Sequence, residues 1–299
     1  MSFERKDLTF DSENTDCAAW LYLPAEPRPH PVVVMAHGFA GERAWRLPAY
    51  AERFADAGIA SFLFDYRNFG DSAGEPRNLI APKRHCEDWA NAVEYVRERP
   101  EIDSSRLGLW GTSLSGGHVL RTAARSGDIS ALVCQVPFSD GPRTAMNVMA
   151  QGGVKYAYGA LSSGVKDVLR LLVGAEPYYI PVVADPGEFA LMNTPGAREG
   201  VERIIPAGCD WENRCPARIA LTFPLYRPIV WAERVEAPVL VQWASQDKLI
   251  PANTTRNLVD RLQTVEHECY EMNHFEGYVG DLFRRIVAEQ IEFLKKTLR

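Results

Sequence analysis

The 299-residue sequence predicts an α/β fold in which helices cover both faces of a mostly parallel, doubly wound sheet. Short β-rich segments alternate along the chain with segments that carry apolar residues at helical spacing. Several β-rich segments are continuous apolar runs, which are typical of parallel strands buried on both faces. Hydrophobic residues make up 46% and charged residues 24% of the chain, as in ordinary globular proteins, which excludes disorder, collagen and coiled coil as its class.

The predicted elements follow one another in the order that βαβ crossovers require. The strands are expected at residues 17–24, 31–36, 60–66, 107–110, 131–136, 238–244 and 267–272. The helices are expected at residues 43–57, 83–97, 114–125, 253–262 and 282–298.

One connection is far longer than the others. About a hundred residues separate the strand that ends at residue 136 from the strand that begins at residue 238, whereas connections in such folds normally have about 2–6 residues. We therefore predict a helical cap of residues 141–231, inserted into a core domain of residues 1–140 and 232–299. The cap helices are expected at residues 143–150, 165–173 and 197–205.

Aromatic side chains are frequent in the predicted cap, and two interpretations of them stay open. They form the core of the cap and its seam with the sheet, or a subset lines an apolar substrate pocket beneath the cap, where ligand sites often lie. The residues concerned are Tyr156, Tyr158, Tyr178, Tyr179, Phe189, Trp211, Phe223, Tyr226 and Trp231.

The charge pattern argues against large anionic partners. The chain has 33 Lys and Arg against 39 Asp and Glu, a net charge of -6, and lacks a basic tract, so neither nucleic acid nor an anionic membrane is an expected partner. The first ten residues, MSFERKDLTF, are charged and do not resemble a secretory signal. No later segment approaches the roughly 18 apolar residues of a membrane span. We expect a cytoplasmic protein.

The sequence carries no signal for a metal or cofactor. Its six cysteines, at positions 17, 86, 134, 209, 215 and 269, form no CxxC pair, so we expect reduced thiols rather than a disulfide scaffold or zinc site. Gly159 and Gly164 have the glycine spacing of a phosphate-binding loop. However, Val165 occupies the lysine position and no strand precedes the glycines. No cofactor and no metal are therefore expected.

Two sequence patterns compete for a nucleophilic serine. The literal G-x-S-x-G pattern is GDSAG at residues 70–74, but its Ser72 does not follow a strand directly and Pro76 comes soon after it. The variant GTSLSGG at residues 111–117 stands between a predicted strand and a predicted helix, the setting that exposes a serine hydroxyl above a sheet. We predict Ser113 as the nucleophile and Ser72 as a loop residue. Ser115 occupies a position where glycine is usual.

A serine hydroxyl needs a base, and the base needs an acid that orients it. Asp247 lies in the loop after the strand predicted at 238–244, and His274 follows the last predicted strand. The chain order serine, acid, histidine is one that known triads use. We predict Asp247 as the acid and His274 as the base, with Asp140 as the second candidate for the acid.

The remaining histidines are given other roles. His30 and His85 are expected in a loop or on a helix surface, and His267 in a strand. His118 lies one turn into the helix after Ser113, where packing is the expected role.

An oxyanion that forms at the substrate must be met by backbone N–H donors. The N–H of Leu114, at the start of a helix, is the first predicted donor. The loop HGFAG at residues 37–41 follows an early strand, and the N–H of Phe39 is the second. The alternative is that this loop is a glycine-rich turn without a catalytic role.

The motifs AHGFAG, DYRNFGDSAG, GTSLSGG, SQDKLIP and NHF, spread over nearly the whole chain, resemble those of the α/β-hydrolase superfamily. The resemblance implies an α/β-hydrolase fold, in which the DYRNFGDS segment is a structural loop. GTSLSGGH together with a cap resembles the dienelactone-hydrolase and S15-peptidase-like branch, which includes esterases, thioesterases and acyltransferases of polyketide acyl chains. Haloalkane dehalogenases and epoxide hydrolases have aspartate where this chain has Ser113.

The expected function is hydrolysis of carboxylic esters or thioesters of small to medium apolar acyl groups through an acyl-enzyme on Ser113. An acyltransferase and a C–C bond hydrolase that use the same triad are the alternatives, and a non-catalytic ligand-binding protein is a third. The expected partner is the small-molecule ester or thioester, and the sequence allows a homodimer.

Overall fold

A computed structural model describes residues 3–299 of the chain. Met1 and Ser2, part of the N-terminal stretch considered above, lie outside the described residues. Within this range, eight strands form one mixed sheet in the order β1-β2-β4-β3-β5-β6-β9-β10. The strands are β1 (Phe3–Asp11), β2 (Asp16–Pro24), β3 (His30–Ala36), β4 (Ala60–Phe64), β5 (Ile102–Thr112), β6 (Ala131–Gln135), β9 (Val239–Ala244) and β10 (Val265–Tyr270). Pairing is parallel from β4 to β10, which confirms the predicted α/β-hydrolase fold class.

The sequence analysis missed β1, which pairs antiparallel with β2 at the edge of the sheet. Only Phe10 among its nine side chains is buried, so the strand shows none of the apolar run that marks the central strands. β2 also runs antiparallel to its other neighbour, β4.

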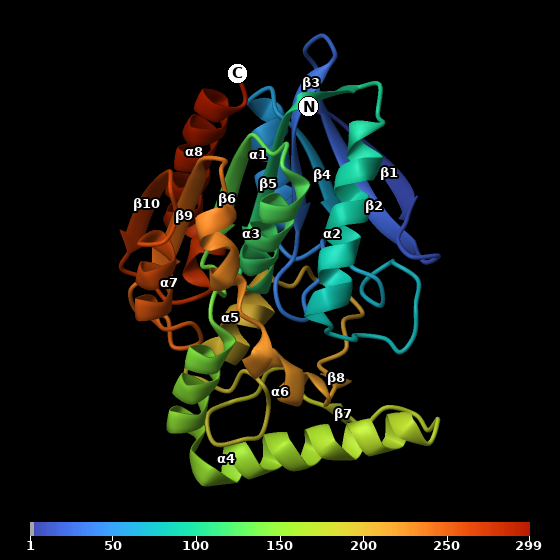
Figure 1. The fold of residues 1–299 in the computed structure, drawn as a ribbon, viewed down its shortest axis with the longest axis vertical. Helices are drawn as coiled ribbons and strands as arrows, with labels where there is room; N and C mark the ends of the chain where they lie inside the picture. The colour runs from blue at the N-terminus through green and yellow to red at the C-terminus, as the bar shows by residue number, and fades with distance from the viewer. Residues whose placement is uncertain (1–2) are drawn as a thin grey trace.

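Helices cover both faces of the sheet (Figure 1). They are α1 (Leu47–Asp56), α2 (Pro82–Arg97), α3 (Leu114–Ser126), α7 (Ala252–Val259) and α8 (Gly280–Thr297). Alternate residues of β3 point to opposite faces. Val34 packs with the α2 and α3 cluster, whereas Val33 packs with the α1 and α8 cluster. Burial on both faces explains why the central strands are continuous apolar runs.

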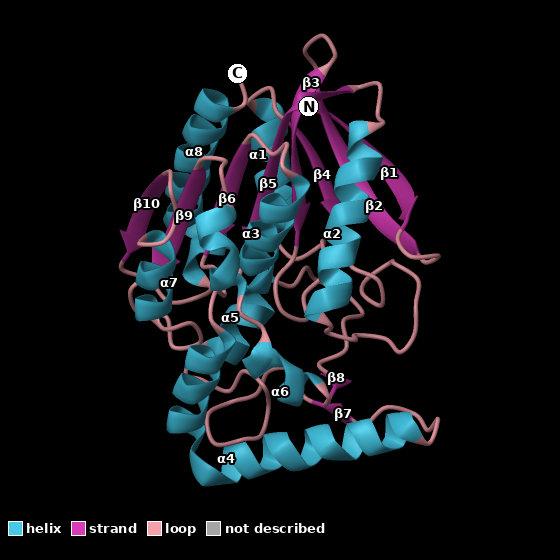
Figure 2. Cartoon of the chain, in the orientation of Figure 1, coloured by secondary structure: helices cyan, strands magenta, loops and turns pink. Residues whose placement is uncertain are grey.

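The long segment between β6 and β9 lies at one end of the sheet, below the carboxyl ends of the parallel strands in Figure 2. It contains α4 (Gly141–Leu172), α5 (Ala197–Ile204), α6 (Ile219–Thr222), the 3-10 helices η1 (Phe223–Leu225) and η2 (Pro228–Arg234), and the two-residue strands β7 (Tyr179–Ile180) and β8 (Cys215–Pro216). The division into a core and a separate cap stays a prediction.

The cap helices differ in part from those expected. α4 consists of two arms, because Gly153 has the non-helical angles φ 68° and ψ -172°. The second arm begins well before the predicted residue 165. Residues 159–164, GALSSG, are mostly small and show no apolar periodicity, so the sequence did not predict the helix that runs through them. The described residues contain no helix with the length and hydropathy needed to cross a bilayer.

His37, His85 and His118 lie in the protein interior behind the nucleophile. His85 is 2% exposed and its ring stacks on Tyr66 at 4.1 Å, so the prediction of a surface position for His85 is wrong. His30, at the start of β3, is also buried, contrary to expectation. His118 is buried as predicted, and its Nδ1 lies 2.7 Å from the hydroxyl of Tyr226. His37 lies 4.6 Å from the Tyr66 ring.

Burial changes the pKa values of the histidines and of two aspartates in this interior. Loss of hydration lowers the pKa of His37 and His118 to about 3 and lowers the pKa of His85 well below its ordinary value. Burial raises the pKa of Asp65 and Asp88 to about 6, although each accepts hydrogen bonds from an arginine.

These shifts predict acid-sensitive stability. Unfolding exposes the three histidines, whose pKa returns to about 6.5. The stability that their neutral forms provide is therefore present above pH 6.5 and is lost as pH falls toward 3. Asp65 and Asp88 act in the opposite direction, because their stabilising neutral forms are lost as pH rises through about 6.

The variant His118→Asn tests the contribution of one histidine. We expect its stability deficit relative to the wild type to shrink by about 1.4 kcal/mol per pH unit between pH 6 and 4, because one proton less is taken up on unfolding. Urea unfolding at several pH values measures this difference. Parallel pH dependence of the two proteins would contradict it.

Candidate active site

Ser113 occupies a sharp turn between β5 and α3. Its backbone angles, φ 54° and ψ -119°, lie in a region that residues with a Cβ seldom adopt. The turn is held from two sides, because Ser113 N donates to the Gln135 carbonyl at 2.9 Å and Phe138 N donates to the Ser113 carbonyl at 2.8 Å. The loop after β6 therefore fixes the backbone of the serine.

Glycines make this turn sterically accessible. A Cβ on Gly111 would collide with the carbonyl of Ser115, and a Cβ on Gly116 would lie 2.9 Å from Cα of Pro137. On the other side, a Cβ on Gly38 would lie 2.9 Å from Cβ of Ser113. The three glycines bring β5, α3 and the loop after β3 close to the serine.

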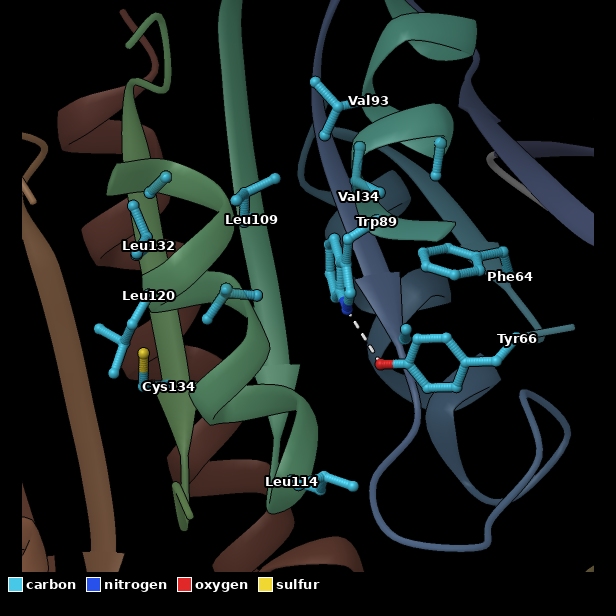
Figure 3. Close-up of a cluster of buried hydrophobic side chains, with 14 of the residues drawn as sticks. Val34, Phe64, Tyr66, Trp89, Val93, Leu109, Leu114, Leu120, Leu132 and Cys134 are labelled. Carbon is cyan, nitrogen blue, oxygen red and sulfur yellow. Dashed lines mark hydrogen bonds between the residues drawn. The ribbon is translucent and has the colours of Figure 1, made fainter. Parts of the chain in front are cut away.

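The unusual Ser115 has a partner in the interior. Its Oγ shares a short hydrogen bond with the Tyr66 hydroxyl, which accepts a second bond from Trp89 Nε1 at 2.9 Å. Figure 3 shows Trp89 and Tyr66 packed among the aliphatic side chains of the core. The added hydroxyl is therefore paired rather than buried without a partner. The sequence contained no local signal for this contact.

The predicted nucleophile, base and acid meet at the carboxyl ends of three strands. His274 Nε2 lies 3.1 Å from Ser113 Oγ, and His274 Nδ1 lies 2.6 Å from Asp247 Oδ2. The second carboxylate oxygen of Asp247 accepts the N–H groups of Leu249 and Ile250 at 2.8 and 2.9 Å. A carboxylate only accepts, so the proton of the neutral imidazole belongs on Nδ1 and Nε2 is free to accept from the serine.

A local turn holds the imidazole in this position. The Asn273 side chain accepts the N–H groups of Phe275 and Glu276 at 2.9 and 3.2 Å, while the Glu276 carboxylate accepts the N–H of Asn273 at 2.7 Å. This reciprocal pattern resembles a capping box. Both neighbours of His274 are thereby fixed, and His274 is only 5% exposed.

The competing candidates lie elsewhere. Ser72 is buried, and its Oγ donates to the Asp65 carbonyl at 2.8 Å while accepting the N–H of Ala18 at 2.9 Å. Its side chain thus ties a loop to the sheet, in accord with the predicted structural role. Asp140 accepts a hydrogen bond from Arg227 at 3.3 Å and forms an ion pair with Arg143, so Asp247 and not Asp140 is the partner of His274.

Phe39 and Leu114, the predicted oxyanion donors, border the same cavity as Ser113 and His274. Leu114 is the first residue of α3, where N–H groups have no acceptor within the helix. The loop that carries Phe39 is fastened by Trp211, whose Nε1 donates to the Ala40 carbonyl at 2.9 Å and whose ring meets Trp45 edge-on. Trp211 belongs to the segment predicted as the cap.

The larger cavity at the serine is lined mostly by apolar side chains. α4 supplies a large part of its wall. The lining residues are Phe39, Ser113, Leu114, Phe138, Thr144, Ala145, Val148, Met149, Tyr156, Ala160, Leu191, Met192, Ile219, Ala220, Phe223, Pro224, Leu249, Ile250 and His274. Of the nine cap aromatics singled out in the sequence, Tyr156 and Phe223 line this cavity, whereas Tyr158 is exposed on the outside. The aliphatic and Met lining was missed, because its spacing does not differ from that of any amphipathic helix.

A second, smaller cavity also reaches Ser113 and His274. It lies toward α5 and the loop after β3, and its walls include the polar side chains of His37, Thr112 and Tyr278. The Thr112 and Tyr278 hydroxyls bond to each other. Phe39 and Met192 border both cavities, so the triad stands where two differently lined spaces meet.

Comparison with known proteins identifies the family of the chain. Residues 27–162 match the family described as serine aminopeptidase, S33. The chain is also 40% identical to the quorum-quenching protein AidA of Acinetobacter baumannii, over 98% of this chain and 95% of the relative. The chain belongs to the α/β-hydrolase family.

Members of this α/β-hydrolase family have diverse names. The polyketide transferase ATR5 of Stachybotrys chlorohalonatus is 28% identical over 99% of this chain and 98% of the relative. Other relatives are named thiohydrolases. The crystal structure of the α/β hydrolase GrgF from Penicillium sp. sh18 has a TM-score of 0.84 at 24% identity and covers 99% of both chains, which shows the shared fold.

The close contacts of the glycines around Ser113 predict that an added methyl group on strand β5 is harmful at Gly111 but not at Gly108. Gly111→Ala should destabilise the protein by about 1–3 kcal/mol and abolish labelling of Ser113 by a fluorophosphonate probe, because the new methyl displaces the turn. Gly108→Ala on the same strand is the matched control, since its Cβ meets nothing closer than the Ala131 carbonyl at 3.3 Å. Urea unfolding and probe labelling measure both. Equal behaviour of the two variants would refute the steric argument.

Proposed function

We propose that this protein hydrolyses carboxylic esters or thioesters of small to medium apolar acyl groups through an acyl-enzyme on Ser113. The observation that carries the proposal is the imidazole of His274, which bridges Ser113 Oγ and Asp247 Oδ2 beside an apolar cavity. A serine nucleophile with an oriented base is the arrangement that acyl transfer requires.

Each residue has a defined role in the proposed reaction. His274 Nε2 takes the proton of Ser113 as its Oγ attacks the acyl carbon, and Asp247 stabilises the imidazolium that forms. The N–H groups of Phe39 and Leu114 receive the negative charge on the former carbonyl oxygen. His274 then protonates the departing alcohol or thiol, and the same imidazole activates the water that releases the acid.

The two cavities suggest how the substrate is divided. The larger cavity has an almost wholly apolar lining and suits the acyl chain. The smaller one has polar groups in its walls and suits the alcohol or thiol that leaves. Both parts of the substrate would then meet at Ser113 and His274.

Acyl transfer to an alcohol or amine is the second candidate. It is favoured by the relatives named polyketide transferases and by the apolar side chains of α4 that line the cavity at the serine. Product analysis with an added acceptor distinguishes transfer from hydrolysis. A C–C bond hydrolase would use the same three residues.

The cytoplasm remains the proposed compartment. It is supported by the six cysteines, all of which are free thiols.

The first functional test replaces each candidate serine. Ser113→Ala should lower kcat for a p-nitrophenyl ester by about 10⁴–10⁶-fold and abolish fluorophosphonate labelling, because no nucleophile remains. Ser72→Ala should retain catalysis and lose only about 1–3 kcal/mol of stability from its buried hydrogen bonds. Activity that survives in Ser113→Ala and disappears in Ser72→Ala would reverse the assignment.

The second test addresses the division of the substrate. Val148→Phe, in the larger cavity, should lower kcat/KM for long acyl chains about 10- to 200-fold and leave the preference among alcohols unchanged. Val201→Phe, in the smaller cavity, should instead select against bulky alcohols at a fixed acyl group. Two ester series, one varied in acyl length and one in alcohol size, measure this. The same selectivity change in both variants would contradict the assignment of the cavities.

A further inference from the structure

Tyr156, near the start of the second arm of α4, stands between the larger cavity and a hollow on the surface of the molecule. The surface hollow lies between the start of this arm and the loop of residues 186–195, and we call it the outer groove. Of the described residues, Tyr156 alone lines both the larger cavity and the outer groove. Its side chain therefore forms the partition between the two spaces.

The two spaces differ in their lining. The larger cavity presents mostly apolar side chains. The outer groove carries the polar or charged side chains of Gln151, Lys155, Glu188 and Asn193. An alkyl chain is stabilised where it is removed from water, so it gains from the first space and little from the second. The ring of Tyr156 thus marks an end of the apolar lining.

Several contacts hold the ring of Tyr156 in place. Its base lies against Gly152, where a Cβ would be only 2.6 Å from Cβ and Cγ of Tyr156. Its hydroxyl donates to the Leu191 carbonyl at 3.3 Å, and burial raises the pKa of Tyr156 to about 12, so the hydroxyl keeps its proton. The ring of Phe189 packs beside it at 5.8 Å. The partition is therefore a fixed part of the cavity wall.

The partition stands away from the nucleophile. Ser113 lies in the turn between β5 and α3, at the carboxyl edge of the sheet. The second arm of α4 forms the lower edge of the molecule in Figure 1, farther from the sheet than α6. An acyl chain bonded to Ser113 has to cross the cavity between these elements before it meets the ring of Tyr156.

We propose that Tyr156 sets the longest acyl chain that this protein accepts. Straight chains that end at its ring stay within the apolar lining, whereas longer chains meet a fixed side chain and are excluded. A smaller residue at this position joins the larger cavity to the outer groove and lets the end of a longer chain pass. This inference rests on the proposed function, which assigns the acyl chain to the larger cavity, and adds the residue that limits its length.

Esters graded in acyl length test the proposal. For p-nitrophenyl esters from acetate to palmitate, the wild-type kcat/KM should rise with chain length and then fall sharply. Tyr156→Ala should raise kcat/KM for the esters beyond this limit by about 10- to 200-fold and leave the value for acetate within about threefold. Tyr156→Phe keeps the ring and should keep the wild-type limit. Tyr158→Ala is the matched control, because it removes the same side chain from a position that is 73% exposed on the same arm.

A second substitution covers loss of stability. Removal of a buried ring leaves a cavity and destabilises the fold, so circular dichroism and urea unfolding accompany each variant. Tyr156→Leu keeps more of the packing and should extend the accepted length by a smaller amount than Tyr156→Ala. A shift of the limit in Tyr156→Phe would contradict the steric role of the ring.

Binding without turnover separates this inference from the proposed reaction. In a Ser113→Ala background, calorimetry with straight-chain fatty acids from butyrate to palmitate measures which lengths the cavity holds. Addition of Tyr156→Ala should lower the dissociation constant of the longest acids about 10-fold or more and leave that of butyrate unchanged. If the wild type cleaves no ester but the acids show this change, the proposed reaction is wrong and the length limit stands. An unchanged length profile for the acids in the folded Tyr156→Ala and Tyr156→Leu variants would overturn the role of Tyr156.

Discussion

The positive φ of Ser113 is the constraint on which the site depends, because a serine in that conformation stands clear of both the strand and the helix it joins. It persists only where the surrounding structure enforces it, here through hydrogen bonds to Gln135 and Phe138 and through the close approach of Gly38. A parallel sheet brings the loops after β3, β5, β9 and β10 to one edge, where ligands of such folds bind. The fold thus supplies the position and the loops supply the chemistry.

Helix α4 connects substrate binding to the outer surface of the molecule. Its first arm and the inner face of its second arm line the larger cavity, whereas Tyr158 and Leu161 of the second arm are exposed on the outside of the molecule. The break at Gly153 lets one chain segment turn from the mouth of the site to the edge of the molecule. Relatives with the same fold are named hydrolases and transferases, so the cavity walls, and not the sheet, are where differences in substrate are expected.

The interior behind the nucleophile is polar for a protein core. His85 and His118 pack around Tyr66, whose hydroxyl bonds to Ser115 in the turn after the nucleophile. Tyr226, from the segment before η2, bonds to His118. Burial lowers the pKa of these histidines and keeps them neutral, so the free energy of unfolding decreases at low pH. The same contacts join α2, α3 and the segment between β6 and β9 directly beneath the serine.

The sequence alone predicted the positions of the central strands along the chain, Ser113 rather than Ser72 as the nucleophile, and Asp247 and His274 as its partners, because strand periodicity and turn motifs are local signals. It did not reveal β1, whose side chains are exposed, or the burial of His85, which depends on the packing of α2 against Tyr66. Only the tertiary structure showed that Asp247 and not Asp140 contacts His274, joined Ser115 to Tyr66, and placed Tyr156 inside the cavity and Tyr158 outside it. These outcomes depend on contacts between residues far apart in the chain, and no local pattern encodes the distance between them.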